Sequence, residues 1–266
     1  MRLAIQHETT YRYESPVQYS IQQLRLTPAN ATAQFVRHWH VEAPGKLDTS
    51  VDAYGNTLHT LVLTRPHCEI RLRVSGEVDT MPLHDGRLGE VIGAVPLEHF
   101  TCATRLTEAN DAIRELAGET GALDRPAGLI ELADRIRARV SHLPGATEVA
   151  ISAADALEAG EGVSQDHVHV MLACCRARGV PARYVSGYID GGDTPQTASH
   201  AWVDVWLNDV GWISVDVTRS EFASGRYCRV AQGRDYDAAA PVRGTRIGGR
   251  EERLQVSLRV NADEVQ

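Results

Sequence analysis

The turn Gly162-Val163-Ser164-Gln165-Asp166 is the first of three places in the sequence whose residue types could support nucleophilic chemistry. Counted from Ser164, positions 168, 171, 172 and 175 hold Val, Met, Leu and Cys, and residues three and four apart share one face of a helix. Ser164 is therefore expected at the start of a helix, on its buried side. Unpaired backbone N–H groups and the helix dipole favour an oxyanion there. The simpler interpretation is that Ser164 only caps the helix, because serine is among the best N-cap residues.

The other two places are residues 199–205 and 211–218, where polar and apolar residues alternate as in strands. His200 and Asp216 can share a face only if the hairpin loop between the two strands has an odd length. With the three-residue loop 208–210, the numbers of opposed residues sum to 418, and Asp216 becomes the diagonal neighbour of His200, roughly 7–8 Å away between backbones. A two-residue loop would put the pair on opposite faces. Taken singly, His200 would be an ordinary half-exposed strand histidine and Asp216 a solvated or turn-capping carboxylate.

Other polar residues near Ser164 suggest support for the site and no metal centre. His167 and His169 are two apart, so on a helix they do not face each other, and we expect neither a metal nor a cofactor. Asp166 and His169 are three apart and could pair, which would brace the turn that carries Ser164. With Gln165, Ser199 and Trp202 they form the predicted site support or substrate cleft.

The first part of the chain favours short strands separated by Gly, Pro and Asn, a pattern typical of a β-sandwich or small barrel. The predicted strands cover residues 2–7, 9–13, 22–27, 37–41, 58–63 and 69–78. Residues 80–100 are rich in Gly and Pro and are expected to be a linker.

Helical spacing begins after this linker, and strands return near the end. Helices are predicted over residues 109–118, 129–140, 153–159 and 165–178, and strands over 182–189, 199–207, 212–218 and 254–260. The expected fold is therefore α+β. A β-sandwich-like domain (residues 1–95) precedes a domain of helices packed on an antiparallel sheet (residues 96–266).

Composition excludes several function classes. The formal net charge is −8, and no block of basic residues suggests a nucleic-acid partner. No apolar run approaches the roughly 18 residues of a membrane helix, and the first residues lack the pattern of a signal peptide. The five cysteines are irregularly spaced, so no disulfide framework is expected and the cytoplasm is the default compartment.

Residues 162–188, from Gly-Val-Ser-Gln-Asp-His to Val-Ser-Gly-Tyr, resemble the nucleophile helix and following strand of bacterial transglutaminase-like proteins. Residues 198–205, Ala-Ser-His-Ala-Trp-Val-Asp-Val, resemble their histidine strand. Residues 211–218, Gly-Trp-Ile-Ser-Val-Asp-Val-Thr, resemble their aspartate strand. The β-rich start and the tail, with Val-Ala-Gln-Gly-Arg-Asp-Tyr at 230–236, are also similar to this group, so the resemblance covers nearly the whole chain.

This resemblance implies a papain-like fold with a Cys-His-Asp triad that acts on amide bonds. His200 would be the general base and acid, Asp216 would hold its ring in the useful tautomer, and Ser164 would occupy the nucleophile position. The family residue at that position is cysteine. Cys174 and Cys175 cannot replace it, since they lie about three helical turns further along.

Three explanations for Ser164 stay open. The chain could be an inactivated Cys→Ser variant, a working Ser-His-Asp hydrolase, or a degenerate enzyme that only binds. A thiol ionises readily beside His⁺, whereas a hydroxyl must lose its proton during attack, so a site built for thiolate should be weaker with serine. The expected function is amide-bond hydrolysis or acyl transfer on a peptide or small amide, and the alternative is a binding or scaffold protein. The β domain could also supply an interface between copies of the chain.

Overall fold

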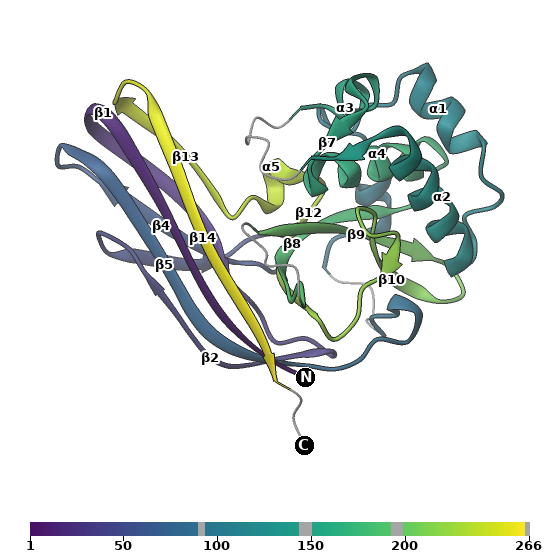
Figure 1. Ribbon diagram of the computed structural model, residues 1–266, viewed down its shortest axis with the longest axis horizontal. Coiled ribbons are helices and arrows are strands. Elements are labelled where there is room, and N and C mark those ends of the chain that lie inside the picture. The colour runs from purple at the N-terminus through teal and green to yellow at the C-terminus, as the bar shows by residue number, and fades with distance from the viewer. Residues whose placement is uncertain (90–93, 144–150, 193–198, 264–266) are drawn as a thin grey trace.

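The computed structural model of this protein describes residues 1–89, 94–143, 151–192 and 199–263. The strands in these ranges form two large antiparallel sheets, and helices cover the second of them (Figure 1). The first sheet consists of β1 (Arg2–Thr27), β2 (Gln34–Glu42), β3 (Leu47–Val51), β4 (Thr57–Leu63), β5 (His67–Thr80), β13 (Val242–Gly248) and β14 (Glu252–Asp263). The α+β class predicted from the sequence is confirmed.

Strand β1 is the long strand to which most of the first sheet is paired. The first half of β1 pairs with β5 and β14, and its second half pairs with β4 and β13. β1 changes partners at one bend, marked by Pro16 in β1, Pro66 between β4 and β5, and Gly248-Gly249 between β13 and β14. Both glycines have positive φ, 86° and 74°, which suits residues without a Cβ. The bend folds the sheet halves together over a core of Leu24, Leu61 and Leu72, among others.

The second sheet has the order β11-β10-β9-β8-β12. Its strands are β8 (Ala182–Ile189), β9 (His200–Leu207), β10 (Gly211–Asp216), β11 (Glu221–Phe222) and β12 (Tyr227–Gly233). The helices are α1 (Asp111–Gly118), α2 (Pro126–Arg139), α3 (Ala153–Ala159), α4 (Ser164–Ala177) and α5 (Tyr236–Ala239). A two-stranded parallel pair, β6 (Ser141–His142) with β7 (Glu161–Gly162), precedes α4.

Helix α4 is the central helix of the larger core. It lies between the other long helices and the second sheet (Figure 1). The face predicted to be buried is buried completely, at Val168, Met171, Leu172 and Cys175. Burial of four such side chains contributes about 1.5–3 kcal/mol each, which fixes the position of the start of α4 against the sheet.

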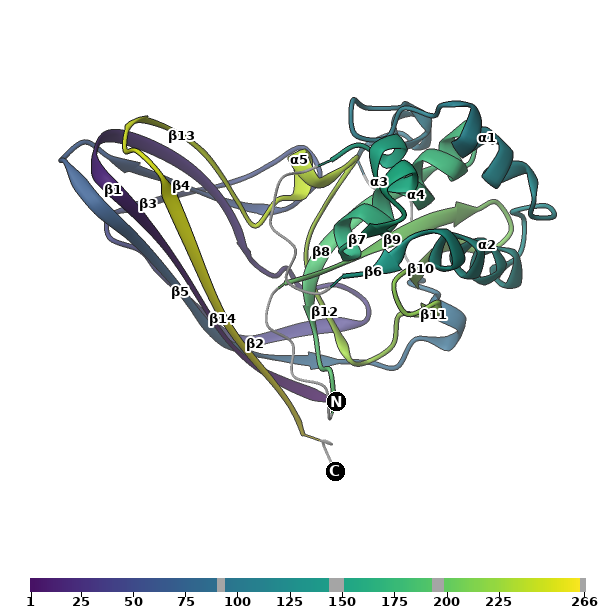
Figure 2. The same ribbon diagram turned by 45° about the horizontal axis from the view of Figure 1, so that its top comes forward.

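The two sheets pack against each other through β8 and β12 on one side and β1, β5 and β14 on the other (Figure 2). Leu3 and Val78 of the first sheet contact Tyr188 and Cys228 of the second in one apolar cluster. His7 adds a polar contact, because its Nδ1 lies 2.9 Å from the Tyr188 hydroxyl. Within the described ranges, none of the helices has the length and apolar character that crossing a bilayer requires.

Several sequence expectations need correction. β1 runs without the break expected near residue 8, and β3, β12 and β13 were not predicted. The division after residue 95 assigned the C-terminal strands to the second domain, whereas β13 and β14 pair with β1 in the first sheet. The expected linker contains two short 3-10 turns, His84–Gly86 and Leu97–Thr101; its residues 90–93 lie outside the described ranges.

Candidate active site

Ser164 is the first residue of α4, and Val163 is its N-cap. The capping role falls to Asp166, whose Oδ2 accepts a hydrogen bond from the Val163 N–H at 2.8 Å. Gly162 makes room for this arrangement, since a Cβ there would lie 2.7 Å from Asp166 Oδ2. The interpretation of Ser164 as an N-cap is therefore wrong, and its half-buried side chain is available for another role.

His200 and Asp216 form a hydrogen-bonded pair at the end of the second sheet. His200 Nε2 lies 2.6 Å from Asp216 Oδ2. The pairing of β9 with β10 has the register predicted from the three-residue loop, with Leu207 opposite Gly211 and Val203 opposite Val215. The parity argument that put the imidazole and the carboxylate on one face is confirmed.

Asp216 is fully buried and is held from several sides. Its Oδ2 also accepts a hydrogen bond from the Tyr227 hydroxyl at 2.7 Å, and its Oδ1 accepts one from the Arg219 N–H at 3.1 Å. Burial alone would raise the pKa of Asp216. The charge of His200 and the hydrogen bonds from His200, Tyr227 and Arg219 outweigh burial and lower this pKa. Asp216 is therefore a carboxylate at neutral pH.

The contact with Asp216 determines which nitrogen of His200 can act as a base. A carboxylate accepts, so Nε2 carries the ring proton when the imidazole is neutral, and Nδ1 keeps its lone pair. His200 is 8% exposed, so the ring is shielded but not closed off. Nδ1 is the nitrogen left to take a proton from a nucleophile.

The first turn of α4 is tied to the strand end that carries Asp216. His167 Nε2 lies 2.8 Å from the Val140 carbonyl oxygen, and its Nδ1 lies 3.4 Å from Thr218 Oγ1. Ser164 is three residues before His167 on α4, so it lies about one helical turn from the contact between His167 and Thr218. Among the described residues no hydrogen bond joins Ser164 to His200; such bonds are often long before substrate binds.

The remaining predicted support residues occupy different surroundings. Trp202 is buried, with its ring stacked 6.4 Å from that of His200, and it forms a wall behind the imidazole. Gly187 permits this, because a Cβ there would lie 2.7 Å from the Trp202 ring. Gln165 and Ser199 are half-buried, next to Ser164 and His200 in the chain.

The suggested pairing of Asp166 with His169 is wrong. Asp166 bonds the Val163 N–H, and His169 Nε2 accepts a hydrogen bond from the Tyr236 N–H at 3.3 Å. Burial lowers the pKa of His169 to about 4, so the ring is neutral at pH 7 and can accept. In the described part of the chain, no three His, Cys, Asp or Glu side chains are grouped so as to hold a metal ion.

The two cysteines on α4 have no access to the site. Cys174 and Cys175 are fully buried, and burial raises the pKa of Cys175 to about 12. Such thiols stay protonated and unreactive at neutral pH.

Three residues around Asp216 were missed by the sequence analysis: Arg219, Glu221 and Tyr227. They come from the turn after β10, from the two-residue strand β11 and from β12. No local periodicity marks them, and only the fold brings them to Asp216.

A buried ionic network lies in the same sheet, centred on Asp204, four residues after His200 on β9. Asp204 on β9 accepts hydrogen bonds from Arg183 Nε at 2.8 Å and from Arg229 Nη1 at 2.7 Å. The Ser214 hydroxyl also donates to it. Burial would raise the pKa of Asp204, but the charges of Arg229 and Arg183 outweigh it and lower this pKa to about 2.

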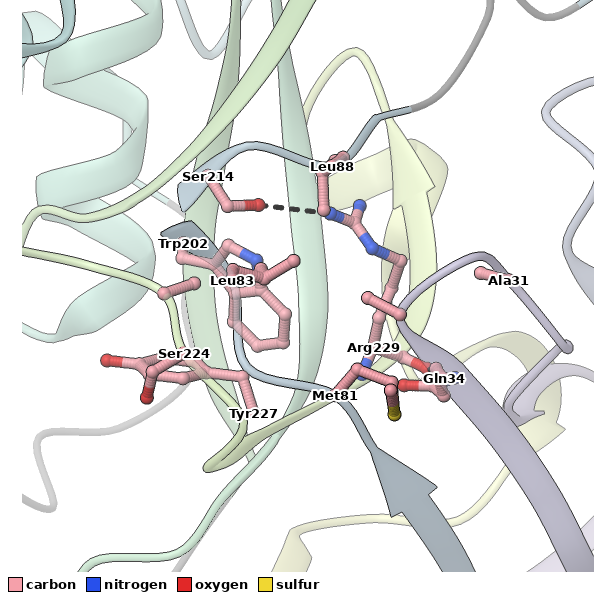
Figure 3. Close-up of a pocket in the computed structure, with 12 residues that line it drawn as sticks. Ala31, Gln34, Met81, Leu83, Leu88, Trp202, Ser214, Ser224, Tyr227 and Arg229 are labelled. Carbon is pink, nitrogen blue, oxygen red and sulfur yellow. Dashed lines mark hydrogen bonds between the residues drawn. The ribbon is translucent and has the colours of Figure 1, made fainter. Parts of the chain in front are cut away.

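A small cavity lies beside Trp202 and Tyr227, between the two sheets (Figure 3). Trp202 faces Arg229 across it, and Arg229 Nη2 donates to Ser214 Oγ at 3.1 Å. Its volume of about 30 Å³ accommodates one or two waters and no peptide. Neither Ser164 nor His200 lines it, so the cavity is not a substrate site for this pair.

Two family models match the chain. Residues 3–79 match the bacterial transglutaminase-like N-terminal region, and residues 114–217 match the transglutaminase-like superfamily. The second range contains Ser164, His200 and Asp216.

Proteins similar to this chain match either nearly all of it or a shorter segment. An uncharacterized protein of Mycobacterium leprae is 31% identical over 263 residues, which are 93% of this chain and 94% of that protein. One of Mycobacterium tuberculosis is 32% identical over 273 residues, 91% of this chain and 87% of that protein. A protein-glutamine gamma-glutamyltransferase of Pseudomonas aeruginosa is 33% identical over 100 residues, 33% of this chain and 15% of that protein.

A solved structure has the same fold. The crystal structure of a proposed cysteine protease from Cytophaga hutchinsonii superposes with a TM-score of 0.78 and 21% identity, covering 100% of this chain and 92% of that chain. At that identity the likeness concerns the arrangement of elements.

Proposed function

This chain belongs to the transglutaminase-like superfamily and has its papain-like fold, and on that premise we propose that it cleaves or transfers acyl groups at amide bonds. The substrate would be a peptide or a small amide. Ser164 would be the nucleophile, His200 the general base and acid, and Asp216 the partner of His200. No cofactor takes part in this scheme, and the cytoplasmic location stays a prediction.

The observation that carries the proposal is the bond between His200 Nε2 and buried Asp216, 2.6 Å long. It assigns the lone pair to Nδ1 and stabilises the imidazolium that forms when Nδ1 takes a proton. In catalytic triads a buried carboxylate in this position orients the histidine ring and stabilises its charged form.

The proposed first step is attack of Ser164 Oγ on the amide carbon. The hydroxyl proton goes to His200 Nδ1, and a tetrahedral intermediate with a negatively charged oxygen forms. His200 then gives the proton to the leaving nitrogen as the C–N bond breaks, which leaves an acyl group on Ser164. Water or an amine next attacks the ester carbonyl and gives its proton to His200 Nδ1. The bond between Ser164 Oγ and the acyl carbon then breaks, and His200 returns the proton to Oγ as the product leaves.

The start of α4 suits the developing negative charge. The N–H groups of Ser164 and Gln165 have no backbone acceptor among the described residues, as expected for the first turn of a helix. Donors of this kind stabilise an oxyanion by about 3–4 kcal/mol each in acyl-transfer enzymes.

The decisive test compares Ser164→Ala and Ser164→Cys with the unchanged chain on a panel of peptide and amide substrates. If the unchanged chain is active and the Ser164→Ala variant is inactive, the result supports a serine enzyme. Activity in Ser164→Cys alone supports a site made for a thiolate, in which serine is inert. Ser50→Ala, on the exposed strand β3, is the control and should change nothing.

Two outcomes would reject the proposal. Equal activity in all three chains removes Ser164 from the mechanism. No turnover in any of them, with a peptide still bound in calorimetry, supports the alternative of a binding protein that has lost its chemistry.

A further inference from the structure

The hydroxyl of Tyr227 lies between two carboxylates. It is 2.7 Å from Asp216 Oδ2 and 2.8 Å from Glu221 Oε1. Tyr227 is 6% exposed and Asp216 is fully buried, whereas Glu221 is half-buried. A chain of close contacts therefore runs from His200 through Asp216 and Tyr227 to Glu221, at the edge of the site.

Tyr227 has one proton to give to these two acceptors. Burial, with the charge of Asp216, raises the pKa of Tyr227 above its ordinary value, so the phenol keeps its proton at any working pH. A phenol carries one O–H donor, and each carboxylate oxygen is within hydrogen-bonding distance. The more the proton is drawn to Glu221, the less it neutralises Asp216.

We propose that Tyr227 is a positioning residue for the His200–Asp216 pair, and that Glu221 competes with Asp216 for its proton and so tunes the basicity of His200. The catalytic consequence of this inference rests on the function proposed above. When Tyr227 donates mainly to Glu221, Asp216 presents more negative charge to the imidazole, and His200 holds its proton more strongly. When Tyr227 donates mainly to Asp216, the reverse holds.

Among the residues that the structure describes, the other charged or titratable groups around this chain come from the turn after β10, from α4 and from β6. Arg219 Nε, in the turn after β10, lies 3.7 Å from Asp216 Oδ2. His167 on α4 contacts Thr218, and the ring of His142 on β6 packs 6.0 Å from the ring of His167. These groups stay the same in the variants below, so a change in His200 reports on Tyr227 and Glu221.

The test is the titration of His200 followed by NMR on histidine-labelled full-length chain, with its signal assigned from a His200→Asn variant. In Tyr227→Phe, Asp216 loses a donor, and the His200 midpoint should rise by about one pH unit. In Glu221→Gln, the competitor is weaker and a negative charge is gone, so the midpoint should fall by about half a unit. The shifts are opposite in sign, which a merely structural role would not produce.

Matched controls are Tyr188→Phe and Glu131→Gln. Tyr188 is buried and its side chain packs against the first sheet, where its hydroxyl bonds His7, and Glu131 is on the outside of α2. Both controls should leave the His200 midpoint unmoved. If both variants fold, shifts of the same sign overturn the inference. If Tyr227→Phe does not fold, Glu221→Gln decides alone, and a His200 midpoint that stays or rises in that variant overturns the inference.

The pH profile of kcat/KM separates this inference from the proposed function. In an active chain, its acidic limb should follow the two NMR shifts. A chain without turnover whose midpoints still move in opposite directions rejects the function and keeps the tuning of His200. An active chain whose midpoints and acidic limb both stay in place rejects the tuning alone.

Discussion

Asp216 accepts hydrogen bonds from His200, Tyr227 and the Arg219 N–H while it is closed off from solvent. In the proposed mechanism, a buried carboxylate kept ionised in this way would support the charge that develops on the imidazole in the transition state. We predict that Asp216→Asn lowers kcat by about 10³–10⁴-fold while the chain stays folded, as loss of the acidic partner does in other triads. Steady-state kinetics on any substrate that the chain turns over, with circular dichroism, measures this.

The control for that variant is Asp209→Asn, in the exposed loop of the same hairpin. It makes the same chemical change without touching His200 and should keep full activity. A loss below about tenfold in Asp216→Asn would show that the His200–Asp216 bond has a structural role only.

The pair itself could be predicted from the sequence, and its surroundings could not. His200 and Asp216 are on consecutive alternating strands, so the loop length alone decides whether they share a face. Tyr227 and Glu221 reach Asp216 by another route, through a two-residue strand and a turn. A strand that short has no periodicity to detect.

At the scale of elements, Asp204 connects four strands of the second sheet. It lies on β9 and binds Arg183 of β8, Ser214 of β10 and Arg229 of β12. Because Asp204→Asn takes away the carboxylate shared by buried Arg183 and half-buried Arg229, we predict a loss of about 3–5 kcal/mol in the free energy of unfolding at pH 7. Urea denaturation measures it, with the exposed Asp48→Asn as control.

The same variant should change how stability depends on pH. The pKa of Asp204 in the fold, about 2, is below its ordinary value of 3.8. The unfolded chain therefore binds the proton first, and the stability that Asp204 contributes is present above pH 4 and lost as pH falls from about 4 to 2. The difference in unfolding free energy between the unchanged chain and Asp204→Asn should narrow over that pH range. A constant difference would contradict the lowered pKa of Asp204 in the fold.

The ends of several elements could be predicted from local signals, whereas the partners of the strands could not. The predicted helices 153–159 and 165–178 differ from α3 and α4 by at most one residue at each end, because caps, Gly and Pro near a helix end signal where it stops. A strand is stabilised by a partner that can be far away in the chain, as β13 and β14 are by β1. Nothing near residue 242 shows that its partner is Leu24.

At the scale of the whole molecule, His7 is a titratable group in the contact between the two sheets. Its ring bonds the Tyr188 hydroxyl and Thr9 Oγ1, each at 2.9 Å. Burial lowers the pKa of His7 to about 4, from 6.5. The unfolded chain thus binds this proton first as pH falls, and we predict that stability drops by about 3 kcal/mol between pH 6.5 and 4 through this group.

The measurement is the unfolding free energy from pH 7 to 4, in the unchanged chain and in His7→Gln. The variant should show a shallower pH dependence, with the remaining slope due in part to His169, whose pKa is also lowered to about 4. His38→Gln is the control, since that side chain is 64% exposed. An identical slope in His7→Gln would mean that His7 does not stay neutral in the fold.

The return of β13 and β14 to β1 has a consequence for synthesis. The ribosome makes β1 to β5 first, and about 160 residues separate the end of β5 from the start of β13. At 5–20 residues per second, the β1 edge waits roughly 8–30 s for its partner. During that interval the nascent chain displays an unpaired strand edge more than twenty residues long, the kind of template on which other chains aggregate. The translation speed of the intervening gene segment, and a chaperone that shields this edge, would therefore affect how much folded protein a cell obtains.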